Sequence, residues 1–305
     1  MIFTLLKIFY RMFEGLILRR LRTSYYRNFS KSKENLDVSG KTILITGAAS
    51  GFGKQFAEDF LSFGKRAPKR LILWDVHPDI NKLYVDKATS VTEIETCQLD
   101  TTDYEKVSAE IQKIKNRKDG AAVNICICNA GISARKTFDQ MDFPTYQKTI
   151  DVNFMSKVFL TKQVLDSFGQ QVDRLIYISS VAGYCPGAVM TEYSPSKHAI
   201  RVFAESLEKE ISGKKGHKNS NCKFSVICPY FAPTKITVYA EDNPIRMSGW
   251  KRIPFKISVQ DVSDALMDAI YYDFGTLVVG RISLVFKFWY YIFGPRHGLE
   301  AVLGR

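Results

Sequence analysis

The sequence predicts an α/β fold: a doubly wound parallel sheet with helices on both faces. Short runs rich in β-branched and aromatic residues recur through the middle of the chain and alternate with stretches of helical periodicity. Strands and helices that alternate in this way form parallel sheets, because each parallel pair needs a crossover connection. The length of 305 residues and the 46% hydrophobic content suffice for one large domain or two small ones.

Seven segments carry the strand pattern. The expected strands are residues 42–46, 70–74, 94–99, 123–128, 174–179, 223–228 and 276–279. Helical periodicity between strands is clearest at positions 262, 265, 266, 269 and 270, where apolar residues share one helical face. No internal repeat is present, and the only linker-like stretch is the polar segment 23–40. A single domain is therefore expected over residues 41–280.

The net charge of +12 is concentrated near the N-terminus, where residues 1–33 contain eight Lys or Arg and a single acid. No zinc-finger or RNA-binding signature accompanies it, so nucleic acid is not an expected partner. The first 18 residues are apolar except for Lys7, Arg11 and Glu14, which share one helical face. We predict a membrane-anchoring amphipathic helix over residues 1–22, followed by basic residues that keep the domain on the cytosolic side. A mitochondrial transit peptide is the alternative, since the arm is Arg-rich and acid-poor.

The C-terminal segment 281–305 is the second unusual end, with six aromatic residues between Phe286 and Phe293. Such density suits a core helix or a homodimer contact, and Trp and Tyr also suit a membrane interface. The expected organisation is an anchor at 1–22, a polar linker at 23–40, the α/β domain at 41–280 and an aromatic tail, with its helix, at 281–305. Whether the anchor spans the membrane or lies on it is left open.

A glycine-rich turn follows the first expected strand, in the sequence TGAASGFG at residues 46–53. Three glycines there allow a tight turn and close approach to a pyrophosphate, which the next helix binds with its N-terminal amides. Asp75 stands at the end of the second strand, 22 residues beyond Gly53, near the distance expected for an acid that binds ribose hydroxyls. The carboxylate repels a 2′-phosphate, and no Arg or Lys occupies 48–50 or 76–77. A Rossmann-type site for NAD, rather than NADP, is predicted.

Tyr193 and Lys197 are four residues apart, at the start of an expected helix. This spacing places both side chains on one helical face. A nearby ammonium favours the phenolate and lowers the pKa of a tyrosine. The pair therefore fits general acid–base chemistry near neutral pH, although the spacing alone is also common on ordinary surface helices.

The six cysteines contain no C-x-x-C pair. Cys126 and Cys128 share one face of an expected strand, which indicates packing rather than metal binding, because no further ligands stand at a recognisable spacing. No metal site is predicted, and reduced cysteines fit a cytosol-facing protein.

These motifs together resemble the short-chain dehydrogenase/reductase family. The matching stretches are TGAASGFG, NAG at 129–131, the Asn of DVNF at 151–154, ISSVAG at 178–183, YSPSK at 193–197 and CPYFAPT at 228–234. They come in the family's order within about residues 40–280, and Ser180 precedes Tyr193 at the family's spacing. LILWD at 71–75 and CPYF-x-x-T are similar to a membrane-associated branch that includes 17-beta-hydroxysteroid dehydrogenases 11 and 13 and retinol dehydrogenase 10.

The resemblance implies a role for each matched residue. Tyr193 would exchange a proton with the substrate hydroxyl, and Lys197 would lower its pKa and hold the nicotinamide ribose. Ser180 would bind the reacting oxygen of the substrate, and Asn153 would position a water that links Lys197 to solvent. The implied cofactor-binding residues are Gly47, Ser50, Gly51, Phe52, Gly53, Asp75, Asp100 (at the adenine), Asn129, Ala130 and Gly131 (at the ribose), Tyr193, Lys197, Pro229 and Thr234 (at the carboxamide).

Three positions depart from the family's usual pattern. Phe52 replaces the common Ile of the glycine-rich turn, and Pro195 stands in the first turn of the catalytic helix, where a proline costs little. Tyr230 replaces the glycine that commonly follows Pro229, so the loop over the nicotinamide is expected to differ in shape.

The predicted function is that of a membrane-associated oxidoreductase of lipid metabolism, which transfers hydride between NAD and a lipid alcohol or ketone such as a retinoid, a steroid or a long-chain alcohol. It would act at the endoplasmic reticulum membrane or a lipid droplet, or in mitochondria if the N-terminus is a transit peptide. The alternatives are an NADPH-dependent 3-keto lipid reductase, similar to ketosphinganine reductases, and a non-catalytic NAD-binding membrane scaffold. A substrate lid is expected in the apolar loop at 236–250.

Overall fold

The computed structural model describes residues 36–212, 219, 221–234, 236 and 257–280. The expected anchor, the aromatic tail, most of the linker and nearly all of the lid loop lie outside these residues. Within the described residues, no helix is long and apolar enough to cross a membrane. Leu36 and Val38, at the end of the expected linker, are buried in the core.

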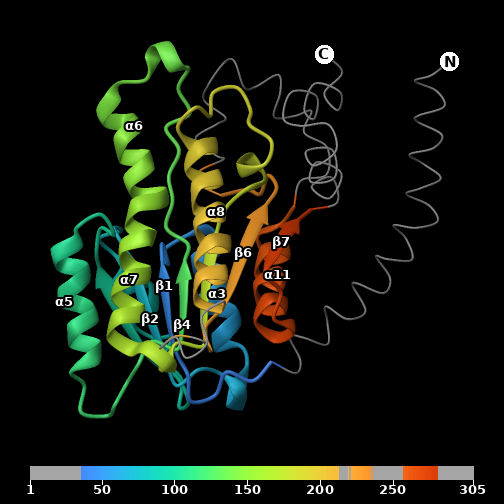
Figure 1. Cartoon of the computed structure of the whole chain (residues 1–305). Coiled ribbons are helices and arrows are strands. Elements are labelled where there is room, and N and C mark those ends of the chain that lie inside the picture. The colour runs from blue at the N-terminus through green and yellow to red at the C-terminus, as the bar shows by residue number, and fades with distance from the viewer. Residues whose placement is uncertain (1–35, 213–218, 220, 235, 237–256, 281–305) are drawn as a thin grey trace, which may run out of the picture.

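A seven-stranded parallel sheet forms the centre of the molecule, as predicted (Figure 1). Its strands are β1 (Thr42–Thr46), β2 (Arg70–Asp75), β3 (Glu93–Gln98), β4 (Ile125–Cys128), β5 (Arg174–Ile178), β6 (Lys223–Pro229) and β7 (Thr276–Val279). The order across the sheet is β3-β2-β1-β4-β5-β6-β7, and every adjacent pair is parallel. From β1, the strands β2 and β3 are added on one side of the sheet. The chain then crosses back, and β4 to β7 are added on the other side of β1. In such sheets, ligands bind at the carboxyl ends of the two strands where the direction reverses.

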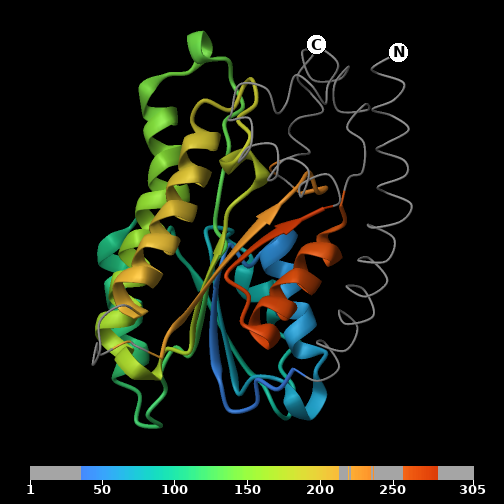
Figure 2. The same ribbon diagram turned by 45° about the vertical axis from the view of Figure 1, so that its right-hand side comes forward.

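Helices cover both faces of the sheet, which makes the fold a doubly wound α/β domain (Figure 2). The α-helices are α3 (Gly51–Leu61), α4 (Ile80–Tyr84), α5 (Tyr104–Lys115), α6 (Phe143–Ile150), α7 (Ser156–Phe168), α8 (Tyr193–Ser212) and α11 (Val259–Tyr272). A π-helical turn, η4 (Asp151–Met155), joins α6 to α7, and short 3-10 turns occur at η2 (Gly64–Arg66), η3 (Phe138–Gln140), η5 (Gly169–Gln171) and η6 (Val181–Gly183).

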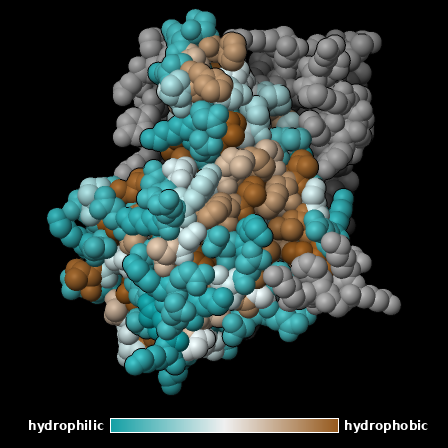
Figure 3. Space-filling model, turned by 60° about the vertical axis from the view of Figure 1, so that its left-hand side comes forward, coloured by the Kyte–Doolittle hydropathy of each residue, from teal (hydrophilic) through white to brown (hydrophobic). Residues whose placement is uncertain are grey.

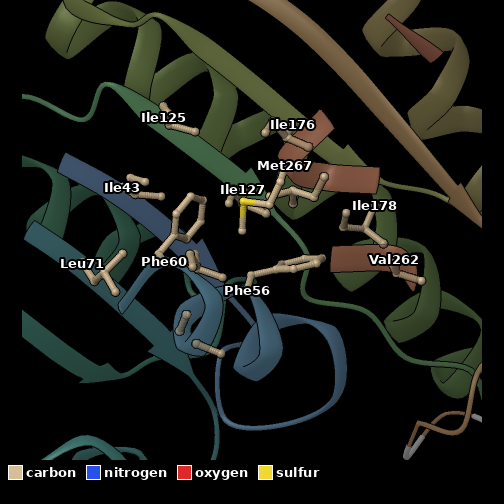
Figure 4. Close-up of a cluster of buried hydrophobic side chains, with 14 of the residues drawn as sticks. Ile43, Phe56, Phe60, Leu71, Ile125, Ile127, Ile176, Ile178, Val262 and Met267 are labelled. Atoms are coloured by element: carbon tan, nitrogen blue, oxygen red, sulfur yellow. The ribbon is translucent and has the colours of Figure 1, made fainter. Parts of the chain in front are cut away.

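Two hydrophobic clusters, one on each face of the sheet, make up the core. Side chains of α3 and α11 pack against one face, where Phe56, Phe60 and Met267 meet strand isoleucines (Figure 4). Side chains of α5, α7 and α8 pack against the other. Because both faces are covered, the central strands read as continuous apolar runs rather than as alternating ones. Burial of each large side chain contributes about 1.5–3 kcal/mol of stability.

The predicted packing of the two strand cysteines is confirmed. Cys126 and Cys128 are fully buried on the face of α5, α7 and α8, with their sulfur atoms 3.9 Å apart. All six cysteines of the chain are free thiols.

The surface is mostly hydrophilic, as Figure 3 shows for one face, but apolar side chains gather near the centre of that face. A buried arginine links β5 to its neighbours at the amino ends of the strands. Arg174 of β5 pairs with Asp273, just after α11, at 2.8 Å, and also donates to Ser225 of β6. These contacts fix the end of the sheet opposite to the carboxyl ends of the strands.

Candidate cofactor and active site

A cavity of about 860 Å³ opens at the carboxyl ends of the strands. It gathers nearly all of the predicted site residues into one place. Those that line it are Gly47, Ser50, Gly51, Phe52, Asp75, Asp100, Asn129, Ala130, Gly131, Ser180, Tyr193, Lys197, Pro229 and Thr234. Of the predicted residues, Gly53 and Asn153 are not in the lining, and both lie directly behind it.

The glycine-rich turn between β1 and α3 requires its glycines for steric reasons. A Cβ added to Gly53 would lie 2.1 Å from the Gly47 carbonyl oxygen, and one added to Gly47 would lie 2.9 Å from the Cα of Ala130. Gly47 also has a φ of +69°, which L side chains rarely adopt. The backbone of β1 and of the β4 loop can therefore approach closely only without side chains.

The start of α3 is suited to bind a phosphate. Its N-cap residue, Ser50, makes no side-chain hydrogen bond to the helix, and the first turn contains no acidic residue. The first amides are thus left to a ligand in the cavity, where the helix dipole favours an anion. These features fit the pyrophosphate of a dinucleotide.

Asp75 occupies the end of β2 beside this turn. One carboxylate oxygen accepts from the backbone N–H of Ala49 at 2.8 Å, and the other accepts from the N–H of His77 at 2.9 Å. Each oxygen retains a further lone pair, so the fixed carboxylate can accept from a ribose hydroxyl. Further along the cavity, Asp100 accepts from the backbone and hydroxyl of Thr102.

The side chains of Asn129 and Asn153 hold neighbouring backbone segments together through hydrogen bonds. The Asn129 side-chain amide donates to the carbonyls of Thr46 and Gly47, at 3.0 Å each. Asn153 is fully buried in η4; it bonds both backbone groups of Ile132 and donates to the Ser196 hydroxyl. No water-binding role for Asn153 follows from these contacts, and that role stays a prediction.

Three of the four expected catalytic residues, all except Asn153, meet on one wall of the cavity. Tyr193 begins α8, and the Lys197 ammonium lies 5.4 Å from the centre of its ring, as the four-residue spacing predicts. Ser180, in the turn after β5, hydrogen-bonds the Tyr193 side chain. The Lys197 ammonium donates to the carbonyl of Ile178 at 3.0 Å, which holds it against the end of β5.

Burial is the main cause of the pKa shifts of Tyr193 and Lys197. It raises the pKa of Tyr193, while the hydrogen bond with Ser180 and the charge of Arg135 oppose the rise. Burial also holds the pKa of Lys197 well below its usual value, and the nearby Lys157 adds to this effect. The predicted lowering of the Tyr193 pKa by Lys197 stays a prediction.

A family model described as short chain dehydrogenase matches residues 41–244. The chain belongs to the short-chain dehydrogenase family. The prediction of this family from the sequence motifs is confirmed. The family match begins at the start of the expected α/β domain and includes the glycine-rich turn, Asp75 and the four expected catalytic residues.

Two relatives illustrate the similarity of this short-chain dehydrogenase to known proteins. Epidermal retinol dehydrogenase 2 of Mus musculus is 32% identical over 212 residues, which cover 67% of this chain and 64% of the relative. The rat (Rattus norvegicus) protein named 15-hydroxyprostaglandin dehydrogenase (NAD(+)) is 29% identical over 215 residues, 68% of this chain and 75% of the relative. The chain thus matches less than two thirds of the length of the retinol dehydrogenase.

A solved structure confirms the fold. A short chain dehydrogenase/reductase from Burkholderia phymatum, in complex with NAD, superposes with a TM-score of 0.70 at 20% identity. The superposition covers 88% of this chain and 96% of that one. The predicted Rossmann-type architecture is therefore confirmed for the described domain.

Three residues of this short-chain dehydrogenase are important near the site and were not expected from the sequence. Arg135 lines the cavity, Glu192 lies buried beside Tyr193, and Lys157 is buried beneath Lys197. The Lys157 ammonium donates to the carbonyls of Cys128 and Ile178, and burial lowers its pKa to about 8. Its position one helical turn after Asn153 was the only sequence signal that could have revealed it.

Tyr230, the departure from the usual glycine, also lines the cavity. Its ring packs edge-on against Phe231 with centroids 5.1 Å apart, and its backbone N–H donates to Val279 of β7. Burial raises the pKa of its phenol to about 12. The bulky side chain therefore forms part of the cavity wall and remains neutral, and the expected difference in the shape of this loop stays a prediction.

The position of Asp75 predicts the choice between the two dinucleotides. Wild-type protein should prefer NAD, because a 2′-phosphate would meet the fixed carboxylate. Asp75→Asn keeps an acceptor oxygen but removes the charge, and should narrow the NAD/NADP ratio of kcat/KM about 10- to 100-fold, equivalent to ~1.4–2.8 kcal/mol. Steady-state kinetics with both cofactors measure this ratio; a wild type that already prefers NADP would contradict the role of Asp75.

Proposed function

We propose that this protein is an NAD-preferring dehydrogenase that interconverts a lipid alcohol and the corresponding aldehyde or ketone. One observation carries the proposal: Tyr193, Ser180 and Lys197 face the same cavity as the glycine-rich turn and Asp75. A dinucleotide bound along the turn would reach the catalytic wall within this cavity. Family membership supports the same chemistry.

The residues of the site divide the chemical work. NAD, when bound, supplies the hydride acceptor for oxidation, or the donor in the reverse direction. Ser180 holds the reacting oxygen of the substrate and stabilises the charge that develops on it. Tyr193 takes the hydroxyl proton during oxidation and returns it during reduction. Lys197 orients the ribose and favours the phenolate when its ammonium is charged.

The cavity supports a lipid-like substrate. Beyond the catalytic wall, its lining is largely apolar and includes Val181, Cys185, Met190, Phe231 and Ile236. Ile236 is the one residue of the expected lid loop within the described part of the chain. A relative bears the name retinol dehydrogenase, which agrees with an apolar alcohol as substrate. A large cavity with few polar groups suits such a molecule.

Attachment to a membrane or lipid-droplet surface completes the proposal. The amphipathic, basic N-terminus and the aromatic tail support it, because both compositions suit a lipid–water interface. We propose that the domain faces the cytosol at the endoplasmic reticulum or a lipid droplet. The homodimer suggested by the aromatic tail stays a prediction.

A reductase that depends on NADPH is the main alternative, and Asp75 disfavours it on electrostatic grounds. A scaffold that binds NAD without turnover is disfavoured by the complete set of Ser180, Tyr193 and Lys197. The two following experiments test catalysis and attachment separately.

Tyr193→Phe removes the proposed proton-transfer group and keeps the ring. General acid–base catalysis typically contributes about 10²–10⁴-fold, so turnover of a lipid alcohol should fall at least ~100-fold, while NAD affinity stays nearly unchanged. The matched control is Tyr104→Phe on α5, outside the cavity, which should retain activity. Turnover and NAD binding are measured on both variants, and near-normal turnover of Tyr193→Phe would refute the assignment.

Deletion of residues 1–22 tests the proposed anchor. The truncated protein should leave the membrane fraction largely, or stay only through its tail, and should still oxidise a detergent-dispersed lipid alcohol, because the catalytic residues lie in the α/β domain. Membrane flotation and activity assays compare it with the full chain. N-terminal cleavage in mitochondria, or a clear preference for short water-soluble alcohols, would contradict attachment to a lipid surface.

A further inference from the structure

Arg135 is a buried cation that forms no ion pair with a carboxylate in the described part of the chain. Its side chain is on the loop after β4, is 8% exposed and lines the cavity. Its Nε is buried and has no hydrogen-bond partner, and its guanidinium forms no ion pair with any described residue. The other buried arginines of the described chain behave differently. Arg70, Arg174 and Arg201 each pair with at least one carboxylate.

The loop that carries Arg135 is held in place by a buried acid. Glu192 is fully buried, and one of its oxygens accepts from the Ser133 hydroxyl and from the backbone N–H groups of Ala134 and Arg135, at 3.0–3.3 Å. Arg135 has a φ of +52°, an unfavourable conformation for a side chain of this size. Glu192 thus fixes the backbone in a strained conformation, and no described carboxylate forms an ion pair with the guanidinium.

The guanidinium lies close to the catalytic group. Glu192 directly precedes Tyr193 in α8, and the charge of Arg135 acts on the Tyr193 phenol. Burial also lowers the pKa of Arg135, while the charges of Tyr193 and Glu192 oppose the fall without forming an ion pair with it. A buried cation that forms no hydrogen-bonded ion pair is costly, and the fixed position of this one at a binding cavity indicates that a ligand supplies the pairing group.

We infer that Arg135 binds a carboxylate of the substrate, so that the preferred substrates are hydroxy or oxo lipid acids rather than neutral alcohols. A planar guanidinium pairs with a carboxylate through two parallel hydrogen bonds, and the match is strongest where water is excluded. A phosphate would bring up to two charges to a single buried cation, which makes a carboxylate the better fit. The rest of the cavity accommodates the apolar chain. This inference rests on the proposed function of the same site.

The test compares acids with their neutral methyl esters. Full-length protein in detergent, with NAD, is assayed on 2-, 3- and 12-hydroxy fatty acids and on the matching esters. For at least one acid, wild-type kcat/KM should exceed that of its ester at least tenfold. Arg135→Met should reduce this ratio to about one, and Arg135→Lys should restore part of it. Lys136→Met is the matched control, since Lys136 is the exposed neighbour on the same loop and pairs with Asp142 instead.

Two outcomes would overturn the inference. One is an acid-to-ester ratio near one in the wild type. The other is an equal loss for acids and esters in Arg135→Met, together with an alkaline shift of the pH profile. That result would mean that Arg135 acts only on the Tyr193 pKa, because removal of the positive charge raises the pKa of the phenol.

A binding measurement separates this inference from the proposed function. Titration calorimetry with palmitate, which has a carboxylate but no reacting alcohol, needs no turnover. Palmitate affinity should fall at least tenfold in Arg135→Met and stay unchanged in Lys136→Met. If no alcohol is oxidised but palmitate binding depends on Arg135, the proposed function fails and the anion site stands. If palmitate binds equally to wild type and Arg135→Met, the anion site fails.

Discussion

The close approach of β1 and β4 at the glycine-rich turn is the constraint on which the rest of the site depends. A Cβ on Gly47 would collide with the Cα of Ala130 in the loop after β4, and the Asn129 side chain donates two hydrogen bonds to carbonyls at the end of β1. This contact lies where the sheet reverses its direction of growth, between the two halves of the fold. A wider separation would move the start of α3 away from the catalytic wall. The cavity therefore owes its position to this contact.

The catalytic wall contains ionisable side chains that are buried away from water. Lys197 and Lys157 both donate to the carbonyl of Ile178, so two ammonium groups converge on the end of β5. Burial and the charge of Lys157 lower the pKa of Lys197, and burial raises the pKa of Tyr193. A bound ligand that adds hydrogen bonds or charge would change this balance. The apolar surroundings therefore make the state of the catalytic pair sensitive to what occupies the cavity.

The strands of the sheet could be predicted from the sequence because each strand is determined by a local pattern of apolar residues. Six β-branched runs and the segment 276–279 became the seven strands, with differences of one or two residues at their ends. The strand expected from residue 123 begins at Ile125, and just before it the Asn124 side chain accepts from the backbone N–H of Thr42, a contact that the local pattern does not show. The glycines and Asp75 could be found for a similar reason, since their spacing reflects one local turn.

Long-range contacts could not be predicted in the same way. Arg135 and Glu192 are far apart in the chain, and nothing in their spacing shows that a buried carboxylate would bind the loop backbone and leave the guanidinium unpaired. The sequence also did not show that the Asn153 side chain bonds to Ile132 and Ser196. Only the fold decides which polar groups reach a buried position and which partners remain for them there.

Direct detection of hydride transfer tests the central claim. Protein with NAD and a long-chain alcohol carrying deuterium on its carbinol carbon should yield NADH one mass unit heavier, with the deuterium on the nicotinamide ring and the lipid recovered as the carbonyl compound. Mass spectrometry of both products measures this transfer. Unlabelled NADH, or no NADH with any lipid alcohol, acid or ester, would contradict the account.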